Sequence, residues 1–395
     1  MNEPKLRFPE FSGEWEEKTL GEECEITAGG DIPKEKISKE KTEIYKVPII
    51  SNGIGNNAIY GYTDSPKITQ AAITISARGT IGYAEYREYP YYPIVRLLSV
   101  FPKDSTSLNT KYLSYILSIQ KYDVTNAGIP QLTVPMIGSV IFHIPPSPAE
   151  QRKIASCLSA MDDLIAAQAE KVEALKEKKT GLMQQLFPQH GETTPRLRFP
   201  EFTGEWEMKK LGEILVERKE VSVITRELPQ LSFTIAEGVI KPEDRKTNQR
   251  DFLMIDKDNK RFSVTRRHDI IYNPANVVYG AIHKNNLCDG VVSPIYKIFW
   301  TKENADFINH LLRRPEFITQ LASRAEGTVT KLKTLKAEAF LDMFVPFPIT
   351  PSEQEKIADC LSALDAQIAA ETEKLTALID YKKGLMQQLF PQPAK

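Results

Sequence analysis

The amino-acid sequence predicts an α+β fold in which two α/β domains are separated by two long helices. These helices are expected to pair as an antiparallel coiled coil, with a pseudo-two-fold internal repeat. Three observations predict this: one helical pattern occurs twice, one aromatic motif occurs twice, and two unlike β-rich segments lie between them. The 395 residues have room for two or three domains. We expect a first domain over 1–149, a first long helix over 150–188, a second domain over 189–352 and a second long helix over 353–391.

The first long helix is predicted from a stretch that returns 203 residues later. Pro148-Ala-Glu-Gln-Arg-Lys-Ile154 returns as Pro351-Ser-Glu-Gln-Glu-Lys-Ile357. The far end, Gly181-Leu-Met-Gln-Gln-Leu-Phe-Pro188, returns without change at 384–391. A proline borders each end of both copies, as is usual around helices. Each copy is therefore expected to be one uninterrupted helix.

Apolar residues recur along both copies in alternating steps of four and three, which is the spacing of a coiled-coil seam. Polar residues interrupt the two stripes at matching places, Gln168 and Lys179 in the first copy and Glu371 and Lys382 in the second. A long helix with a single apolar stripe needs a partner, and the other copy supplies one. The predicted seam consists of Ile154, Leu158, Met161, Ile165, Val172, Leu175, Leu182, Leu186, Ile357, Leu361, Leu364, Ile368, Leu375, Leu378, Leu385 and Leu389.

A second repeat opens each domain. Leu6-Arg-Phe-Pro-Glu-Phe-Ser-Gly-Glu-Trp15 returns 191 residues later as Leu197-Arg-Phe-Pro-Glu-Phe-Thr-Gly-Glu-Trp206, and we expect both tryptophans to pack in the core. Behind this opening motif the two domains are hard to align, although both contain β-branched runs bounded by turn residues. We expect strands over 44–50, 71–76, 94–101, 269–272 and 291–299, and helices over 108–119 and 305–313.

Composition excludes several classes of protein. The net charge is −1, and no apolar run approaches 18 residues, so neither a strongly basic protein nor a membrane protein is indicated. The four scattered cysteines form no CxxC pair, so we expect no metal site and a reduced, cytoplasmic environment. The sequence lacks HExxH, GxSxG, P-loop and Gly-rich dinucleotide motifs. We therefore expect no catalytic residues.

Clusters of Arg, Lys, Asn and Gln in predicted loops could contact phosphates and base edges. A solvated surface is the plain alternative for each cluster. The candidate DNA-binding residues are Arg78, Gln131, Arg245, Arg250, Arg267, Asn286 and Lys331.

The duplicated Pro-x-Glu-Gln-x-Lys-Ile opening, the Gly-Leu-Met-Gln-Gln-Leu-Phe-Pro close and the Phe-Pro-Glu-Phe-x-Gly-Glu-Trp motif resemble the specificity subunits of type I restriction–modification systems. The resemblance covers essentially the whole chain. It implies two target-recognition domains, each reading one half of a bipartite, asymmetric double-stranded DNA site from the major groove, with the coiled coil setting the spacer.

The resemblance also implies a chain that is not itself an enzyme and binds no cofactor. Two methyltransferase subunits would bring S-adenosylmethionine and methylate adenine. Restriction subunits, with ATP and magnesium, would translocate and cleave the DNA.

Two alternatives remain open. Tyr272-Asn273-Pro274-Ala275-Asn276 is similar to the Asn-Pro-Pro-Tyr motif of amino-group methyltransferases, although its last two positions differ and no Gly-rich turn accompanies it. A stand-alone adenine DNA methyltransferase using Asn273 is therefore one alternative, and a simple turn at a strand end is the plain reading of this string. The other alternative is a coiled-coil scaffold that carries two protein-binding modules.

Overall fold

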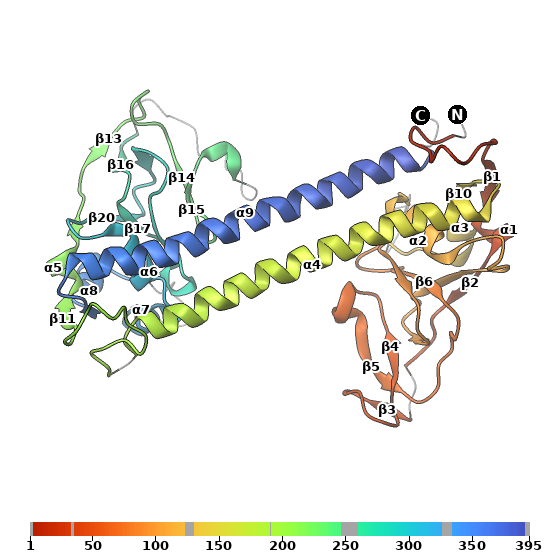
Figure 1. The fold of residues 1–395 in the computed structure, drawn as a ribbon, viewed down its shortest axis with the longest axis horizontal. Helices are drawn as coiled ribbons and strands as arrows, with labels where there is room; N and C mark the ends of the chain where they lie inside the picture. The colour runs from red at the N-terminus through yellow and green to blue at the C-terminus, as the bar shows by residue number, and fades with distance from the viewer. Residues whose placement is uncertain are drawn as a thin grey trace. The chain divides into compact units, whose positions relative to one another are not determined.

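The computed structural model describes residues 3–32, 35–122, 130–189, 191–245, 260–325 and 334–391. It forms two compact units, the first made of Met1–Ala169 and Glu373–Lys395, the second of Glu170–Thr372. Helix α4 (Pro148–Leu186) begins in unit 1 and ends in unit 2, and helix α9 (Pro351–Leu389) runs from unit 2 back to unit 1 (Figure 1). Each unit thus combines one β-rich domain with parts of both long helices, and the predicted α+β fold class is confirmed.

Unit 1 contains two four-stranded sheets and a two-stranded ribbon. The main sheet is antiparallel, with strand order β2 (Cys24–Ala28), β9 (Leu98–Pro102), β6 (Ala72–Ile75), β7 (Ala84–Arg87). The other sheet has the order β3 (Ile37–Ser38), β5 (Ile59–Thr63), β4 (Val47–Ile50), β8 (Tyr92–Pro93). Unit 1 also contains β1 (Glu16–Thr19), which pairs with β10 (Ile141–Ile144), the helices α1 (Leu20–Glu23), α2 (Thr110–Ile119) and α3 (Val134–Gly138), and the short 3-10 helix η1 (Gly55–Ala58).

Unit 2 repeats the main sheet and the ribbon. Its main sheet has the order β12 (Val216–Glu217), β20 (Lys297–Trp300), β17 (Ile270–Tyr272), β18 (Ile282–Lys284), and β11 (Glu207–Lys210) pairs with β21 (Phe344–Phe347). The corresponding helices are α5 (Leu211–Ile214), α6 (Ala305–Leu312) and α8 (Ala337–Leu341). Among its described elements, unit 2 also contains a three-stranded sheet of order β13 (Val221–Ser222), β16 (Phe262–Thr265), β19 (Gly290–Val292), the paired strands β14 (Ser232–Thr234) and β15 (Gly238–Ile240), and helix α7 (Pro315–Arg324).

Three predicted strands are shorter than the sequence suggested. The strand predicted over 44–50 begins only at Val47, and turns occupy part of the other two. Residues 94–97 form a turn closed by the Leu97 amide on the Ile94 carbonyl (3.0 Å), so β9 starts only at Leu98. Residues 291–299 are split between β19 and β20 by a turn closed by the Tyr296 amide on the Ser293 carbonyl (3.2 Å). Both turns contain or follow a proline, which cannot donate to a sheet ladder.

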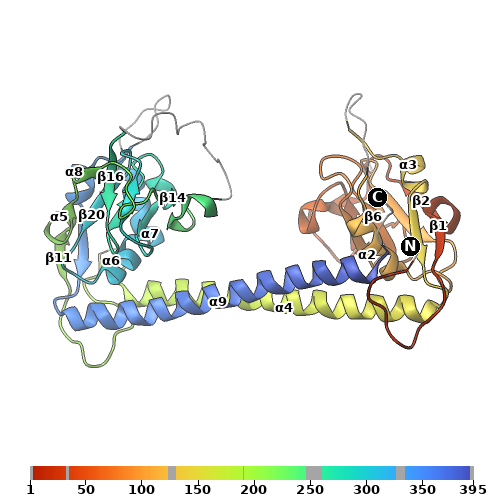
Figure 2. The same cartoon turned by 90° about the horizontal axis from the view of Figure 1, so that it is seen from above.

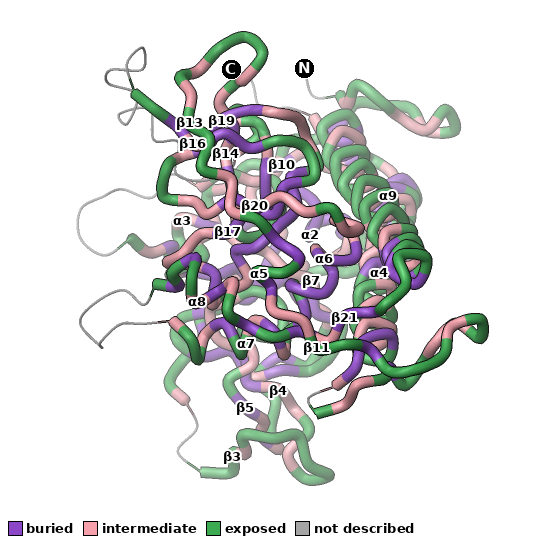
Figure 3. The backbone as a smooth tube through the Cα atoms, turned by 90° about the vertical axis from the view of Figure 1, so that its left-hand side faces the viewer, coloured by how far each residue is buried: buried purple, intermediate pink, exposed green. Residues whose placement is uncertain are grey.

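The structure buries the apolar stripes of the two long helices at least partly. Every apolar seam position is buried or half-buried, and most residues between them are exposed. Buried, intermediate and exposed stretches accordingly alternate along the tubes of α4 and α9 (Figure 3). In unit 1, Ile154 and Leu158 near the start of α4 share a core with Met386 and Leu389 near the end of α9. In unit 2, Leu186 near the end of α4 shares a core with residues near the start of α9, Ile357 and Leu361. Within each unit the two helix segments therefore run antiparallel.

The lysines that interrupt the stripes form ion pairs across the helices. Lys382 pairs with Asp162 in unit 1, and Lys179 pairs with Asp365 in unit 2. Domain helices reach the same carboxylates, because the Tyr115 hydroxyl on α2 donates to Asp162 (2.8 Å) and His310 Nδ1 on α6 lies 4.0 Å from Asp365. Helix α2 thus packs on both the sheet and α4 (Figure 2).

A bidentate ion pair fastens the opening motif to the start of a long helix in both units. Arg7 donates to both carboxylate oxygens of Glu150 (2.8 and 2.9 Å), and Arg198 donates to those of Glu353 with the same distances. Both carboxylates are buried, at 0% and 1% exposure. Trp206 Nε1 also donates to Glu353 (3.1 Å), whereas Trp15 Nε1 is buried without a partner among the described residues.

The glutamine that follows each buried glutamate holds a domain helix. Gln151 accepts from the Asn109 amide and donates to the Ser107 carbonyl, both at 2.8 Å, at the N-terminus of α2. Gln354 accepts from the Asn304 amide (3.2 Å) and donates to Glu303 (3.0 Å), at the N-terminus of α6. The repeated Glu-Gln pair therefore connects each domain to the frame, by which we mean the two long helices and the opening motifs.

None of the described helices combines the length and apolarity that a membrane span requires.

We predict that Arg7→Met lowers the free energy of unfolding of unit 1 by about 3 kcal/mol, because it leaves the Glu150 carboxylate buried and unpaired. Arg198→Met should act in the same way on unit 2. Arg196→Met, which removes an exposed pair with Glu192, should cost less than about 0.5 kcal/mol. Urea midpoints measure all three, and equal effects of the three variants would contradict the role of the buried pair.

Unit 2 contains two buried histidines, and we therefore predict that its free energy of unfolding decreases at acidic pH. Burial lowers the pKa of His283 and of His310 from 6.5 to about 4, assisted by the charges of Arg313 and Lys179 respectively. The unfolded chain takes up these protons near pH 6.5, whereas the folded chain takes them up only near pH 4. The free energy of unfolding therefore keeps its full value above pH 6.5 and decreases as the pH drops from 6.5 toward 4. Each histidine contributes a slope of about 1.4 kcal/mol per pH unit. His283→Gln should remove one proton from the pH dependence of unfolding, and an unchanged slope would contradict this.

Candidate nucleic-acid interface

One end of the main sheet of unit 1 gathers polar side chains from three loops. Strands β2 and β6 end there and β9 begins there, because Ala28 and Ile75 both pair with Leu98. Arg78 follows β6, and Arg96 lies in the turn that leads into β9. The hydrogen bond from the Leu132 amide to the Ala77 carbonyl (3.0 Å) brings Gln131 to the same place.

Three of these side chains contact one another. Arg78 donates to Oε1 of Gln131 through Nε (2.9 Å) and Nη2 (2.6 Å), and Arg96 Nη1 lies 3.5 Å from the same oxygen. The sequence prediction named Arg78 and Gln131 separately, and the structure brings them together. In the part of the chain that the structure describes, neither guanidinium pairs with a carboxylate. The cluster therefore presents hydrogen-bond donors and positive charge.

The turn that carries Arg96 is strained. Its two central residues, Val95 and Arg96, have φ values of 53° and 59°, which β-branched and long side chains rarely adopt. Their amides donate to Gly30 and Gly29 (2.9 Å each), and Asn52 Nδ2 donates to the Val95 carbonyl (2.8 Å). The sequence could not reveal Arg96 as a candidate, because residues 94–101 have the composition of a continuous strand. Strain of this kind costs about 1–3 kcal/mol and is concentrated at functional sites.

A hollow of about 420 Å³ lies beside the cluster. It has an apolar floor that includes Leu98, Leu132 and Val134, and Arg96 and Gln131 also line it. Gly29 is required at its wall, because a Cβ there would lie 2.7 Å from the Pro93 carbonyl carbon. The arrangement offers donors beside an apolar surface, which are the two features that a base edge contacts.

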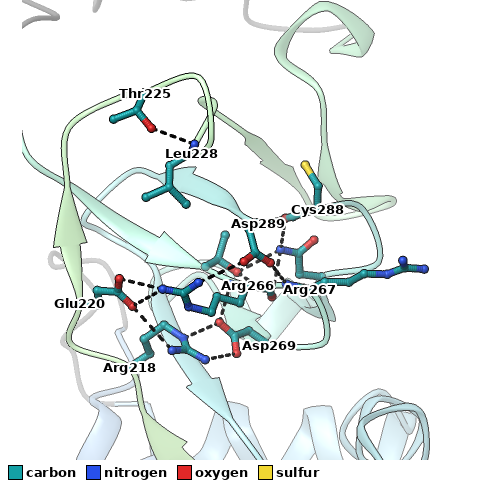
Figure 4. Close-up of polar contacts among 11 residues, drawn as sticks. Arg218, Glu220, Thr225, Leu228, Arg266, Arg267, Asp269, Cys288 and Asp289 are labelled. Carbon is teal, nitrogen blue, oxygen red and sulfur yellow. Dashed lines mark hydrogen bonds and ion pairs between the residues drawn. The ribbon is translucent and has the colours of Figure 1, made fainter.

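In unit 2, Arg218 after β12 and Arg266 after β16 pair with carboxylates through their side chains (Figure 4). Arg218 makes a bidentate pair with Asp269 (2.7 and 2.9 Å), and this hydrogen bonding raises the pKa of Arg218 above its ordinary value. Arg266 contacts Glu220 (3.0 Å) and Asp289 (3.2 Å). The exposed Arg267 uses only its amide for Asp289 (2.8 Å), and Figure 4 shows its side chain extending away from the cluster.

The arginine cluster of unit 2 does not occupy the place of the Arg78–Gln131 cluster of unit 1. Arg267 precedes β17, whose first residue pairs with Phe299, so it lies toward the C-terminal end of β20. There it lines a hollow of about 460 Å³ together with Trp300 and Asn304. The turn that corresponds to 94–97 lies at the opposite, N-terminal end of β20.

The other predicted DNA-binding residues are dispersed. Asn286 is exposed beside the buried Asn285, and Arg245 has a buried Nε that finds no hydrogen-bond partner among the described residues. Arg250 and Lys331 lie outside the described residues. The DNA-binding role of all seven candidates stays a prediction.

The string that is similar to a methyltransferase motif forms a turn. The Asn273 side chain accepts from the Ala275 amide (3.0 Å), and the buried Tyr272 hydroxyl donates to the Leu335 carbonyl (3.1 Å). Both polar groups are thus used within the fold. Among the described residues, no group of three or more His, Cys, Asp or Glu side chains could hold a metal ion.

Comparison with known proteins decides the family. A family model described as "Type I restriction modification DNA specificity domain" matches residues 12–177. A Mycoplasma pneumoniae protein named "Putative type I specificity subunit S.MpnORF289P C-terminus" is 32% identical over 100 residues, which cover 67% of that protein and 25% of this chain. The chain belongs to the type I specificity-subunit family.

Other members of the family match shorter fractions of their own length. Two further M. pneumoniae proteins named as "Putative type I specificity subunit" are 35% and 34% identical over 136 and 152 residues. These matches cover 34% and 37% of this chain but only 36% and 44% of those relatives. The solved "Type-I restriction-modification system S subunit from M. genitalium" has a TM-score of 0.64 at 16% identity, covering 99% of this chain and 100% of that one. The fold of the specificity subunit is therefore shared over the whole chain.

We predict that Val95→Asn stabilises unit 1 by about 1 kcal/mol, because asparagine tolerates the left-handed conformation that valine resists. Val95 is 45% exposed, so the substitution loses little apolar burial. Val95→Ala is the matched control, since alanine keeps a Cβ and gains little in this conformation. Thermal or urea unfolding measures both, and a destabilised asparagine variant would show that the turn is unstrained.

Proposed function

We propose that this chain is the non-catalytic DNA-specificity subunit of a type I restriction–modification complex, and that each β-rich domain reads one half of a bipartite, asymmetric DNA site from the major groove. The observation that carries this proposal is the duplicated frame. The same Arg–Glu pair and the same Glu-Gln contacts hold two domains whose loops and second sheets differ. Two unlike domains held in equivalent frames fit two different half-sites.

The long helices would set the distance between the half-sites. Each has 39 residues, about 58 Å at 1.5 Å per residue. One turn of B-DNA measures about 34–36 Å. If α4 and α9 pair along their whole seam, half-sites separated by at least one turn come within reach, and the base pairs between them stay unread.

The chemistry would belong to partner subunits. Two methyltransferase subunits would dock on the frame, bind S-adenosylmethionine and methylate one adenine in each half-site. Restriction subunits would supply ATP- and magnesium-dependent translocation and cleavage. The role of this chain is to position double-stranded DNA, through phosphate contacts that hold the duplex and base contacts that select the sequence.

Mapping of methylated adenines tests the proposal. The chain, expressed together with its methyltransferase subunits, should direct methylation to one two-part motif with a fixed unread gap. Methylation by the chain alone would instead support a stand-alone methyltransferase. Absence of sequence-specific DNA binding, even with the methyltransferase subunits, would support a protein-binding scaffold.

Lengthening the helices should lengthen the gap. One heptad inserted after Glu173 and one after Thr376 keeps the stripes in phase and adds about 10 Å. The methylated motif should keep both half-sites and gain about three base pairs, at 3.4 Å per base pair. Insertion in α4 alone is the control, because it misaligns the seam and should abolish the motif. An unchanged gap in the double insertion would mean that the methyltransferase subunits set the spacing.

A further inference from the structure

The turn before β9 has an equivalent in the second domain. Strand register aligns the two: Ile75 pairs with Leu98 in unit 1, and Tyr272 pairs with Lys297 in unit 2. Both turns are closed by an amide-to-carbonyl hydrogen bond between their ends, from Leu97 to Ile94 and from Tyr296 to Ser293. This alignment places Arg96 and Ile295 at the same position, and both side chains are exposed.

An exposed isoleucine and an exposed arginine at one position of the strand register differ in what they can contact. The loops around the two turns are alike, since the Leu132-to-Ala77 and Leu335-to-Pro274 hydrogen bonds (3.0 and 3.1 Å) occupy equivalent places. A different side chain at an equivalent position of two similar domains would give these domains different DNA-sequence preferences. The strain at Val95 and Arg96 indicates that the fold holds this turn in a defined conformation.

The neighbours of Arg96 decide which base it suits. Gln131 Oε1 already accepts from Arg78, so it is not free to accept from a base amino group. The cluster therefore offers donors toward a ligand. In the major groove guanine presents two acceptors, O6 and N7, whereas adenine pairs one acceptor with an amino donor and cytosine presents an amino donor. A guanidinium donates to both guanine acceptors at once.

We propose that Arg96, presented by the turn at residues 94–97 and flanked by Arg78 and Gln131, reads a guanine in the half-site of the first domain. This rests on the proposed function, because it assigns a base to a domain that is proposed to read DNA. The second domain carries Ile295 at the same position, so it has no guanidinium for a guanine there.

The test uses the chain with its methyltransferase subunits and a duplex of the mapped site, in which each guanine of both half-sites is replaced in turn by 7-deazaguanine. This base lacks N7 and keeps its pairing. Wild type should bind one of these duplexes about 5- to 150-fold more weakly. Arg96→Ala should bind the unmodified duplex at least as weakly, because it also loses the contact to O6, and it should lose no further affinity on that replacement. Arg96→Lys keeps the charge without the planar guanidinium, so it should retain only part of the preference.

Ile295→Ala is the matched control, and it should keep the sensitivity to that guanine. Three results would overturn the inference while the proposed function stands: a first half-site without guanine, an Arg96→Ala variant that is still sensitive to every guanine, or an equal loss of affinity for all sequences, which would mark a phosphate contact. Wild type without preference for any site would refute the proposed function, and the inference with it.

Discussion

The structure depends on a buried carboxylate that begins each long helix. Glu150 and Glu353 are almost completely removed from solvent, and such a charge is tolerated only when its hydrogen bonds are satisfied. The bidentate guanidinium of Arg7 or Arg198 does this and ties the opening motif to the helix. The adjacent glutamine then fixes the N-terminus of α2 or α6. Two consecutive residues thereby define how a domain meets the frame, which explains why Glu-Gln is repeated while the domain contents differ.

The seam of the helices combines apolar packing with a few specific charges. Leucine and isoleucine side chains supply the buried area, but an apolar stripe alone tolerates shifted alignments. Lys179 and Lys382 pair with Asp365 and Asp162, and a register shift would separate these partners. The same carboxylates face Tyr115 or His310 from the domain helices, so helix pairing and domain position are coupled within each unit.

A repeated scaffold with variable loops suits a protein that must change specificity without losing its assembly. The main sheets of the two units share strand order and register. The differences lie at the sheet ends, where Arg96 in one domain corresponds to Ile295 in the other, and in the second sheet, which has the order β3-β5-β4-β8 in unit 1 and β13-β16-β19 in unit 2. These places lie outside the buried pairs and the seam.

The sequence by itself determined the frame, because its patterns are local and periodic. The 3.5-residue repeat, the duplicated Glu-Gln and the opening motif predicted the long helices, the buried tryptophans and the family. Tertiary structure decided the rest. It showed that Arg78 and Gln131 meet although they lie 53 residues apart, and that residues 94–97 turn where their composition is typical of a strand. It also showed that Arg218 and Arg266 are paired with carboxylates. These contacts join loops from different strands, and no local pattern encodes which loops meet at one end of a sheet.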